Sequence, residues 1–145
     1  MTATPAYGAS APDSGVNPII IDRRELRGED VAIDIAYCGV CHSDLHAARN
    51  DWGRTNYPFV PGHEIVGTVS AVGAGVTRFK VGDRVAVGTT IDSCRKCDAC
   101  QDGEENYCRE GSTGTYNGKD RIDGSPTYGG YSKAIVVAEP FVLRV

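Results

Sequence analysis

The chain has 145 residues, among them six cysteines and 18 glycines, and its formal net charge is −4. A chain of this length fits one domain whose core is large enough to need no disulfides. The longest apolar run is Ala134–Ala138, far short of the roughly 18 residues of a membrane helix, and no basic block occurs. Membranes and nucleic acids are therefore not expected as partners.

The N-terminal residues 1–18 are rich in Ala, Pro, Ser and Gly, and we expect them to be loosely ordered. We expect residues 19–145 to form one domain. Its first clear element is Val31–Tyr37, where apolar residues alternate with small or acidic ones. This period of two predicts a strand with one buried face, formed by Val31, Ile33, Ile35 and Tyr37.

Further along the chain, short periodic segments alternate with turns that contain Gly or Pro. The predicted elements are a short helix over Cys41–Arg49 and strands over Glu64–Val72, Asp83–Val87, Tyr131–Ala138 and Phe141–Val145. Many short strands joined by Gly-containing turns indicate a mainly β barrel or sandwich rather than alternating strands and helices.

The start of the chain has neither the positive region nor the apolar region of a secretory signal. We therefore expect a cytoplasmic protein, in which thiols stay reduced and clustered cysteines usually bind metal.

Four of the cysteines follow the spacing Cys94-x2-Cys97-x2-Cys100-x7-Cys108. Four thiolates this close together match a closed, tetrahedral structural zinc site, and we expect a zinc lobe over residues 92–110. An iron–sulfur cluster fits less well, because its usual last arm is x3 followed by Pro. A phosphate-binding zinc ribbon fits poorly, because the lobe has three basic and six acidic side chains.

A second group of metal-binding and proton-carrying residues lies earlier in the chain. Cys41 and His63 are suitable as two of the three ligands of a Cys2His catalytic zinc, and Asp44 as the acceptor of a ligand imidazole N–H. Ser43 and His46 are candidates for passing a proton to solvent. A single histidine is more often a packing residue than a ligand, so this pattern alone leaves both interpretations open.

Three segments together carry a family resemblance: CGVCHSDLH, VPGHEIVGTVSAVGAGVTRFKVGDRV and CRKCDACQDGEENYC. The chain resembles the medium-chain, zinc-dependent alcohol dehydrogenases. The later run GTYNGKDRIDGSPTYGGYSKAIVVAEPFVLRV resembles more narrowly their cinnamyl-alcohol-dehydrogenase branch, which includes bacterial NADP-dependent aldehyde reductases. The resemblance runs from Asp22 onward and implies the GroES-like catalytic domain, a partly open β-barrel with short helices and a cysteine lobe.

Position by position, the resemblance implies two metal sites and a proton relay. The implied catalytic zinc lies at Cys41, His63 and Glu64, and the implied structural zinc at Cys94, Cys97, Cys100 and Cys108. The implied proton relay is Ser43 and His46, with Asp44 as the carboxylate that orients the liganding histidine. Cys38 is not a ligand in this pattern and is expected to be a small buried residue. Trp52 lies either near the substrate or in ordinary packing.

The implied function is the interconversion of primary alcohols and aldehydes with NADP(H) or NAD(H). The family's third catalytic zinc ligand, its nucleotide-binding domain and a returning segment lie beyond the point where this sequence ends. The run from Gly73 to Arg78 lacks the third glycine of a dinucleotide fingerprint and precedes a strand, so it predicts a turn. We therefore expect the 145 residues alone to be inactive; the alternative is a stand-alone zinc-binding interaction module.

The apolar C-terminal strand predicted over Phe141–Val145 has one charge, at Arg144. Exposed strand edges of this kind pair with other chains. We therefore expect the chain to self-associate through this strand, and we expect a lysine in place of Val142 to favour the monomer.

Overall fold

The computed structural model describes all 145 residues, and most of its regular structure is β-strand. The strands are β1 (Thr2–Gly8), β2 (Asn17–Arg23), β3 (Asp30–Cys38), β4 (Ile65–Val72), β5 (Arg84–Val87), β6 (Thr90–Asp92), β7 (Thr113–Gly114), β8 (Ala134–Ala138) and β9 (Leu143–Arg144). The helices are α1 (His42–Ala48), α2 (Asp98–Gln101) and the 3-10 turns η1 (Glu105–Tyr107) and η2 (Glu139–Phe141). None of them is long and apolar enough to cross a membrane.

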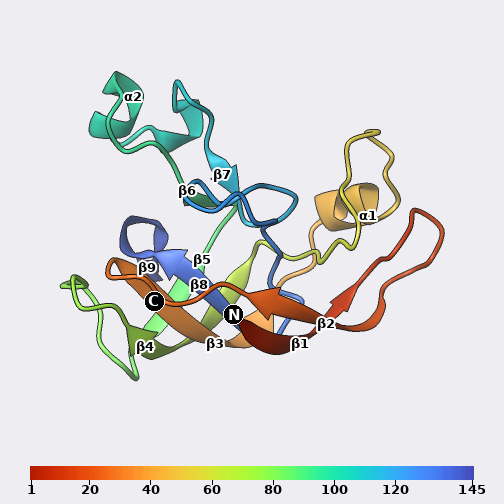
Figure 1. The fold of residues 1–145 in the computed structure, drawn as a ribbon, viewed down its shortest axis with the longest axis horizontal. Coiled ribbons are helices and arrows are strands. Elements are labelled where there is room, and N and C mark those ends of the chain that lie inside the picture. Colours follow the sequence, from red (N-terminus) through yellow and green to blue (C-terminus); the bar gives the residue numbers. More distant parts are fainter.

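The main sheet has the strand order β8-β3-β4-β5-β9, with antiparallel neighbours throughout (Figure 1). Its buried side chains meet in one core, and the sheet curves around them. The two edge strands, β8 and β9, do not pair with each other, so the barrel is not closed. The core consists of Val31, Ile33, Ile65, Val69, Phe79, Val85, Val87, Ile135, Val137 and Val142. The prediction of a mainly β, partly open barrel is confirmed.

Strand β3 follows the predicted alternation only over its first half. Val31 and Ile33 are fully buried, but Tyr37 is 78% exposed, so its predicted place on the buried face is wrong. The pairing of β3 with β4 shifts register between Ile35 and Tyr37, where Ala36 has no partner. Because one extra residue moves every following side chain to the opposite face, Cys38 turns inward in place of Tyr37.

The N-terminal segment differs from the loosely ordered one predicted for residues 1–18. Strands β1 and β2 form an antiparallel hairpin with seven aligned pairs, from Thr2 with Arg23 to Gly8 with Asn17. Ala6 and Ile21 of this hairpin are buried together with Val60. Composition alone missed the hairpin, because the small residues of β1 bury a face only once the isoleucines of β2 lie beside them.

The C-terminal residues form less strand than predicted. After the turn η2, only Leu143 and Arg144 pair with β5, at the edge of the main sheet. Val142 is completely buried in the core, whereas Leu143 is exposed. A lysine at Val142 would therefore disrupt the core rather than block edge pairing. Self-association stays a prediction, and its proper test is at Leu143.

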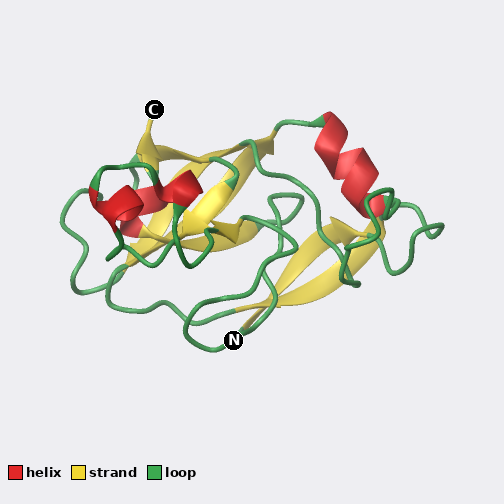
Figure 2. Cartoon of the chain, turned by 90° about the horizontal axis from the view of Figure 1, so that it is seen from above, coloured by secondary structure: helices red, strands yellow, loops and turns green.

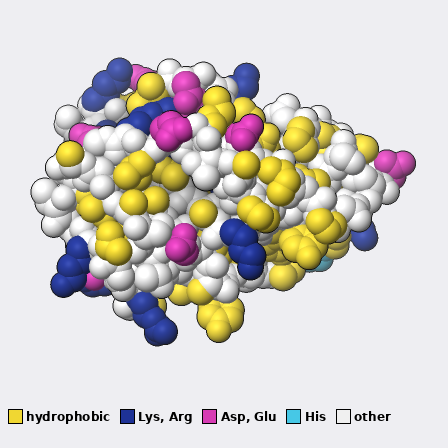
Figure 3. Space-filling view, turned by 60° about the horizontal axis from the view of Figure 1, so that its bottom comes forward, with side chains coloured by type: hydrophobic (Ala, Val, Ile, Leu, Met, Phe, Trp, Pro, Cys, Tyr) yellow, Lys and Arg dark blue, Asp and Glu magenta, His cyan; other side chains and the backbone are white.

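The two groups of candidate ligands belong to separate parts of the fold, one to the segment around α2 and the other to the loops before α1 and β4. The segment around α2 projects at one end and α1 lies at the other, as both ribbon views show (Figures 1 and 2). Hydrophobic side chains gather on the face of the molecule on which the hairpin of β1 and β2 lies (Figure 3). There a cavity of about 750 Å³ is lined by residues of the hairpin, of β3 and of the segment 130–133.

Candidate metal sites

The four cysteines of the lobe come together as their spacing predicts. The sulfurs of Cys94, Cys97, Cys100 and Cys108 all lie within 4.8 Å of one another. The Sγ atoms of Cys94 and Cys100 are 3.8 Å apart, and those of Cys97 and Cys100 are 3.4 Å apart. Thiolates at about 2.3 Å from a tetrahedral zinc lie about 3.8 Å from each other. The lobe therefore has the donor set and the size of a closed four-sulfur metal site.

Hydrogen bonds support these sulfurs from the surrounding backbone and side chains. The N–H of Cys94 donates to Cys108 Sγ at 3.4 Å and lowers the pKa of that thiol. The N–H of Arg109 donates to Cys97 Sγ at 3.4 Å. The hydrogen bond with Ser93 lowers the pKa of Cys100, but burial and the adjacent thiols outweigh it and raise the pKa to about 11. A bound divalent cation would hold all four thiols as thiolates.

Cys41, His63 and Glu64 form the second candidate metal site, with ligand atoms within 4.8 Å of one another. Cys41 precedes α1, and His63 and Glu64 precede β4, so two loop ends of the same region supply the ligands. Gly39 leaves room for the carboxylate of Glu64, which a Cβ at this position would displace. Gly62 has a φ of +101°, which places His63 after a turn that favours glycine.

Asp44 ties the two ligand-bearing loops together. Its buried carboxylate accepts the backbone N–H of Cys41 and the backbone N–H of Gly62, each at 2.9 Å. The hydroxyl of Tyr131 lies 3.5 Å from the same carboxylate. The structure shows no hydrogen bond between Asp44 and the imidazole of His63. The carboxylate thus fixes the separation of the two loops through their backbones instead of orienting the ring.

Ser43 lies between the ligands and contacts a residue that the sequence analysis missed. Its hydroxyl donates to Cys41 Sγ at 3.1 Å and lies 3.4 Å from His63 Nε2. Tyr116 donates its own hydroxyl to Ser43 Oγ at 3.2 Å. Burial raises the pKa of Tyr116, so this phenol is a donor at neutral pH. Tyr116 belongs to the turn-rich segment 111–130, whose composition gives no signal for such a contact.

His46 lies one turn further along α1, on the outer side of the site. Its Nδ1 is 2.8 Å from Asp51 Oδ2, and its ring stacks on His42 and leans against Trp52. No hydrogen bond joins Ser43 to His46, so a proton moving between them needs a bridging hydroxyl or water. Trp52 is 49% exposed and lies against this histidine and Arg54, an arrangement compatible with both roles considered for it.

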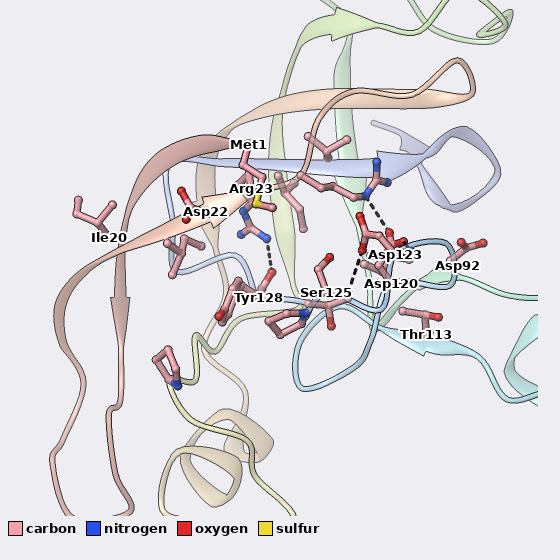
Figure 4. A pocket seen from close by; sticks show the side chains of 18 residues that line it. Met1, Ile20, Asp22, Arg23, Asp92, Thr113, Asp120, Asp123, Ser125 and Tyr128 are labelled. Carbon is pink, nitrogen blue, oxygen red and sulfur yellow. Dashed lines mark hydrogen bonds and ion pairs between the residues drawn. The ribbon is translucent and has the colours of Figure 1, made fainter.

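A buried arginine braces the loop that carries His63. Arg23 donates to the carbonyls of Tyr128 and Gly129 at 2.6 and 2.7 Å and to Ser132 Oγ at 2.7 Å (Figure 4). The segment 129–131 in turn donates three backbone N–H groups to the carbonyls of residues 60–62. Burial lowers the pKa of Arg23 to about 10, and no carboxylate pairs with it. The hairpin is thereby fastened to the residues that precede His63.

Three cavities of the molecule have linings that do not include Cys41, His63 or Glu64. One of about 380 Å³ adjoins Arg23 (Figure 4). Another of about 510 Å³ lies against the cysteine lobe. Cys38 lines the 750 Å³ cavity beside the hairpin and packs against the core. Burial raises the pKa of its thiol. Cys38 is partly buried, in partial agreement with the small buried residue expected there.

The fold and these two clusters define the class of protein. Residues 27–145 match the family described as the alcohol dehydrogenase GroES-like domain, and the chain belongs to this family. It is 53% identical to NADP-dependent alcohol dehydrogenase C 1 of Mycolicibacterium smegmatis over 146 aligned positions, covering 100% of this chain and 42% of that protein.

Two solved structures show the same fold. A cinnamyl alcohol dehydrogenase from Sorghum bicolor matches with a TM-score of 0.95 and 44% identity, covering 99% of this chain and 41% of that one. The CAD from Helicobacter pylori, in complex with NADP(H), matches with a TM-score of 0.95 and 39% identity, covering 99% and 42%. The chain therefore spans about two fifths of the length of these relatives.

Proposed function

We propose that the chain is the metal-binding part of a zinc-dependent alcohol dehydrogenase or aldehyde reductase, which interconverts primary alcohols and aldehydes with NADP(H) in the cytoplasm. The observation that carries this proposal is the pair of separate ligand clusters in one domain, one with four sulfurs and one with mixed donors. The named activities of the relatives support the substrate and cofactor classes.

The lobe of Cys94, Cys97, Cys100 and Cys108 would hold a structural zinc, because its four sulfurs leave no open position. Cys41 and His63 would hold a second zinc, with Glu64 beside them. When bound, zinc supplies Lewis acidity at the substrate oxygen and NADP(H) supplies or accepts the hydride.

The residues of this chain then handle the proton. Ser43 holds a hydroxyl proton next to Cys41 and His63, where a substrate oxygen would lie. His46, with its Nδ1 engaged by Asp51, leaves Nε2 to exchange a proton with water. We expect no hydride transfer by the 145 residues alone, because no dinucleotide fingerprint occurs in them.

Counting metal in the purified chain tests the two sites separately. We expect close to one tightly held zinc per chain, lost on replacing Cys97 by serine and retained in the matched control Cys38→Ser. Because a structural zinc contributes on the order of 10 kcal/mol to the folding of small zinc domains, a chelator should also lower the melting temperature. The structural site would be contradicted if the purified chain contained no zinc and a chelator left its melting temperature unchanged.

The second site is tested with Co2+ after the lobe is filled with zinc. We expect weaker, separate binding that disappears in Cys41→Ser, and visible absorption bands that shift on adding a primary alcohol. Bands that stay unchanged in Cys41→Ser would contradict the site.

A further inference from the structure

The ring of Tyr116 lies against the candidate ligand His63. Their ring centroids are 5.1 Å apart with 15° between the planes, which is a stacked arrangement. The phenol oxygen of the same residue donates to Ser43 Oγ at 3.2 Å. One side chain thus contacts both the imidazole and the hydroxyl of the site.

The surroundings of Tyr116 hold it rigidly in this position. Its ring packs edge-on against Phe59, with centroids 5.0 Å apart, and Phe59 is completely buried. On one side, the N–H of buried Thr115 donates to the carbonyl of Thr89 at 3.0 Å. On the other side, Asn117 accepts the N–H of Asn56 at 2.8 Å and donates to the carbonyl of Arg54 at 3.0 Å.

The direction of the hydrogen bonds follows from this arrangement. Tyr116 donates to Ser43, so the single proton of the Ser43 hydroxyl is directed to its other neighbours, Cys41 Sγ and His63 Nε2. The carboxylate of Asp44 accepts hydrogen bonds from the backbone of the ligand loops, and the Tyr131 hydroxyl lies 3.5 Å from it. Tyr116, in contrast, contacts the imidazole of His63 and the hydroxyl of Ser43 directly.

We propose that Tyr116 is a positioning residue of the Cys41–His63–Glu64 site: its ring fixes the plane of the His63 imidazole, and its hydroxyl fixes the proton of Ser43. The proposal rests on the proposed function for the use of that site. It assigns two separable contributions, because phenylalanine keeps the stacking and loses the hydrogen bond, whereas leucine loses both.

The stacking is tested by NMR of the imidazole protons, with metal in the lobe alone. The chain has three histidines, so the His63 signals are assigned by replacing His42 and His46 in turn. We expect these signals to be displaced upfield by the Tyr116 ring in the wild type and in Tyr116→Phe, and to lose that displacement in Tyr116→Leu. The matched control Tyr37→Leu, at an exposed tyrosine outside both ligand clusters, should leave them in place.

The hydrogen bond is tested by the affinity of the second site for Co2+. A lost hydrogen bond should weaken binding about 3- to 10-fold in Tyr116→Phe, and the loss of both contacts about 10- to 100-fold in Tyr116→Leu. The Co2+ absorption bands should also shift in Tyr116→Leu, which a general loss of stability would not produce.

The two proposals fail in different ways. A wild-type chain that binds no second Co2+ overturns the metal site, while the imidazole signals still decide the stacking. His63 signals that are the same in wild type and Tyr116→Leu overturn the positioning role. If Tyr116→Leu does not fold, Tyr116→Phe decides instead: retention of the upfield displacement supports the stacking, and its loss overturns it.

Discussion

The carboxylate of Asp44 makes the sharpest prediction about how the second site is built. It accepts two backbone N–H groups, from Cys41 and Gly62, while almost completely buried. In Asp44→Asn one side-chain oxygen remains as acceptor, and the NH2 group faces the other N–H. An unpaired buried donor costs about 1–3 kcal/mol, and the loss of a charged acceptor adds to it. We expect Asp44→Asn to lower the free energy of unfolding by about 2–3 kcal/mol.

Urea unfolding of the zinc-loaded chain measures this loss, and amide hydrogen exchange locates it. The N–H groups of Cys41 and Gly62 should exchange faster in Asp44→Asn than in wild type. The N–H groups of β8 should exchange equally fast in both proteins when conditions are chosen so that the two have the same free energy of unfolding. Asp51→Asn is the matched control, because its exposed pair with His46 should contribute no more than about 0.5 kcal/mol. A stability of Asp44→Asn within 0.5 kcal/mol of wild type would refute the reasoning.

Two further predictions concern acid stability and the sheet edge. Burial acts to raise the pKa of Asp120, but hydrogen bonds from Arg27 and from the N–H groups of Asp123 and Ile122 outweigh it and lower the pKa to about 2 from 3.8. The lowered pKa contributes about 1–2 kcal/mol of stability after screening; this contribution is present above pH 4 and is lost as the pH falls toward 2. In Asp120→Asn, urea unfolding at different pH values should show a correspondingly smaller loss of stability in acid. The same pH dependence of stability in Asp120→Asn and wild type would contradict the assignment. Leu143→Lys should raise the monomer fraction in sedimentation experiments if β9 mediates self-association, and a wild type that is monomeric at high concentration would end that hypothesis.

The sequence predicted best those features that depend on local spacing. The x2 spacings of Cys94, Cys97 and Cys100 bring the sulfurs together within one short segment, so the lobe could be predicted without the rest of the fold. The period of two in Val31–Ile33 likewise identified β3. The same rule failed at Tyr37, because the bulge at Ala36 arises from pairing with β4 and leaves no mark in the alternation.

Contacts between segments that are distant in the sequence could not be predicted from the local spacing of residues. The stacking of Tyr116 on His63 joins residues 53 positions apart and depends on the buried Phe59. The sequence suggested that the carboxylate of Asp44 would accept the imidazole N–H of a liganding histidine. In the structure this carboxylate accepts two backbone N–H groups of the loops. The residue types indicated what kind of chemistry the site can support. Only the folded chain shows which atoms each side chain contacts.

The brace around Arg23 has a consequence for how the domain opens. The hairpin, the segment 128–132 and the residues before His63 are joined in series through one guanidinium and three backbone hydrogen bonds. Segments linked in this way tend to open together as cooperative units. Opening of the hairpin would remove the Arg23 contacts to segment 128–132, while the hydrogen bond from Gly62 to Asp44 would still tie the histidine loop to α1. We therefore expect the N-terminal strands to support the Cys41–His63–Glu64 candidate site from one side and Asp44 to support it from the other.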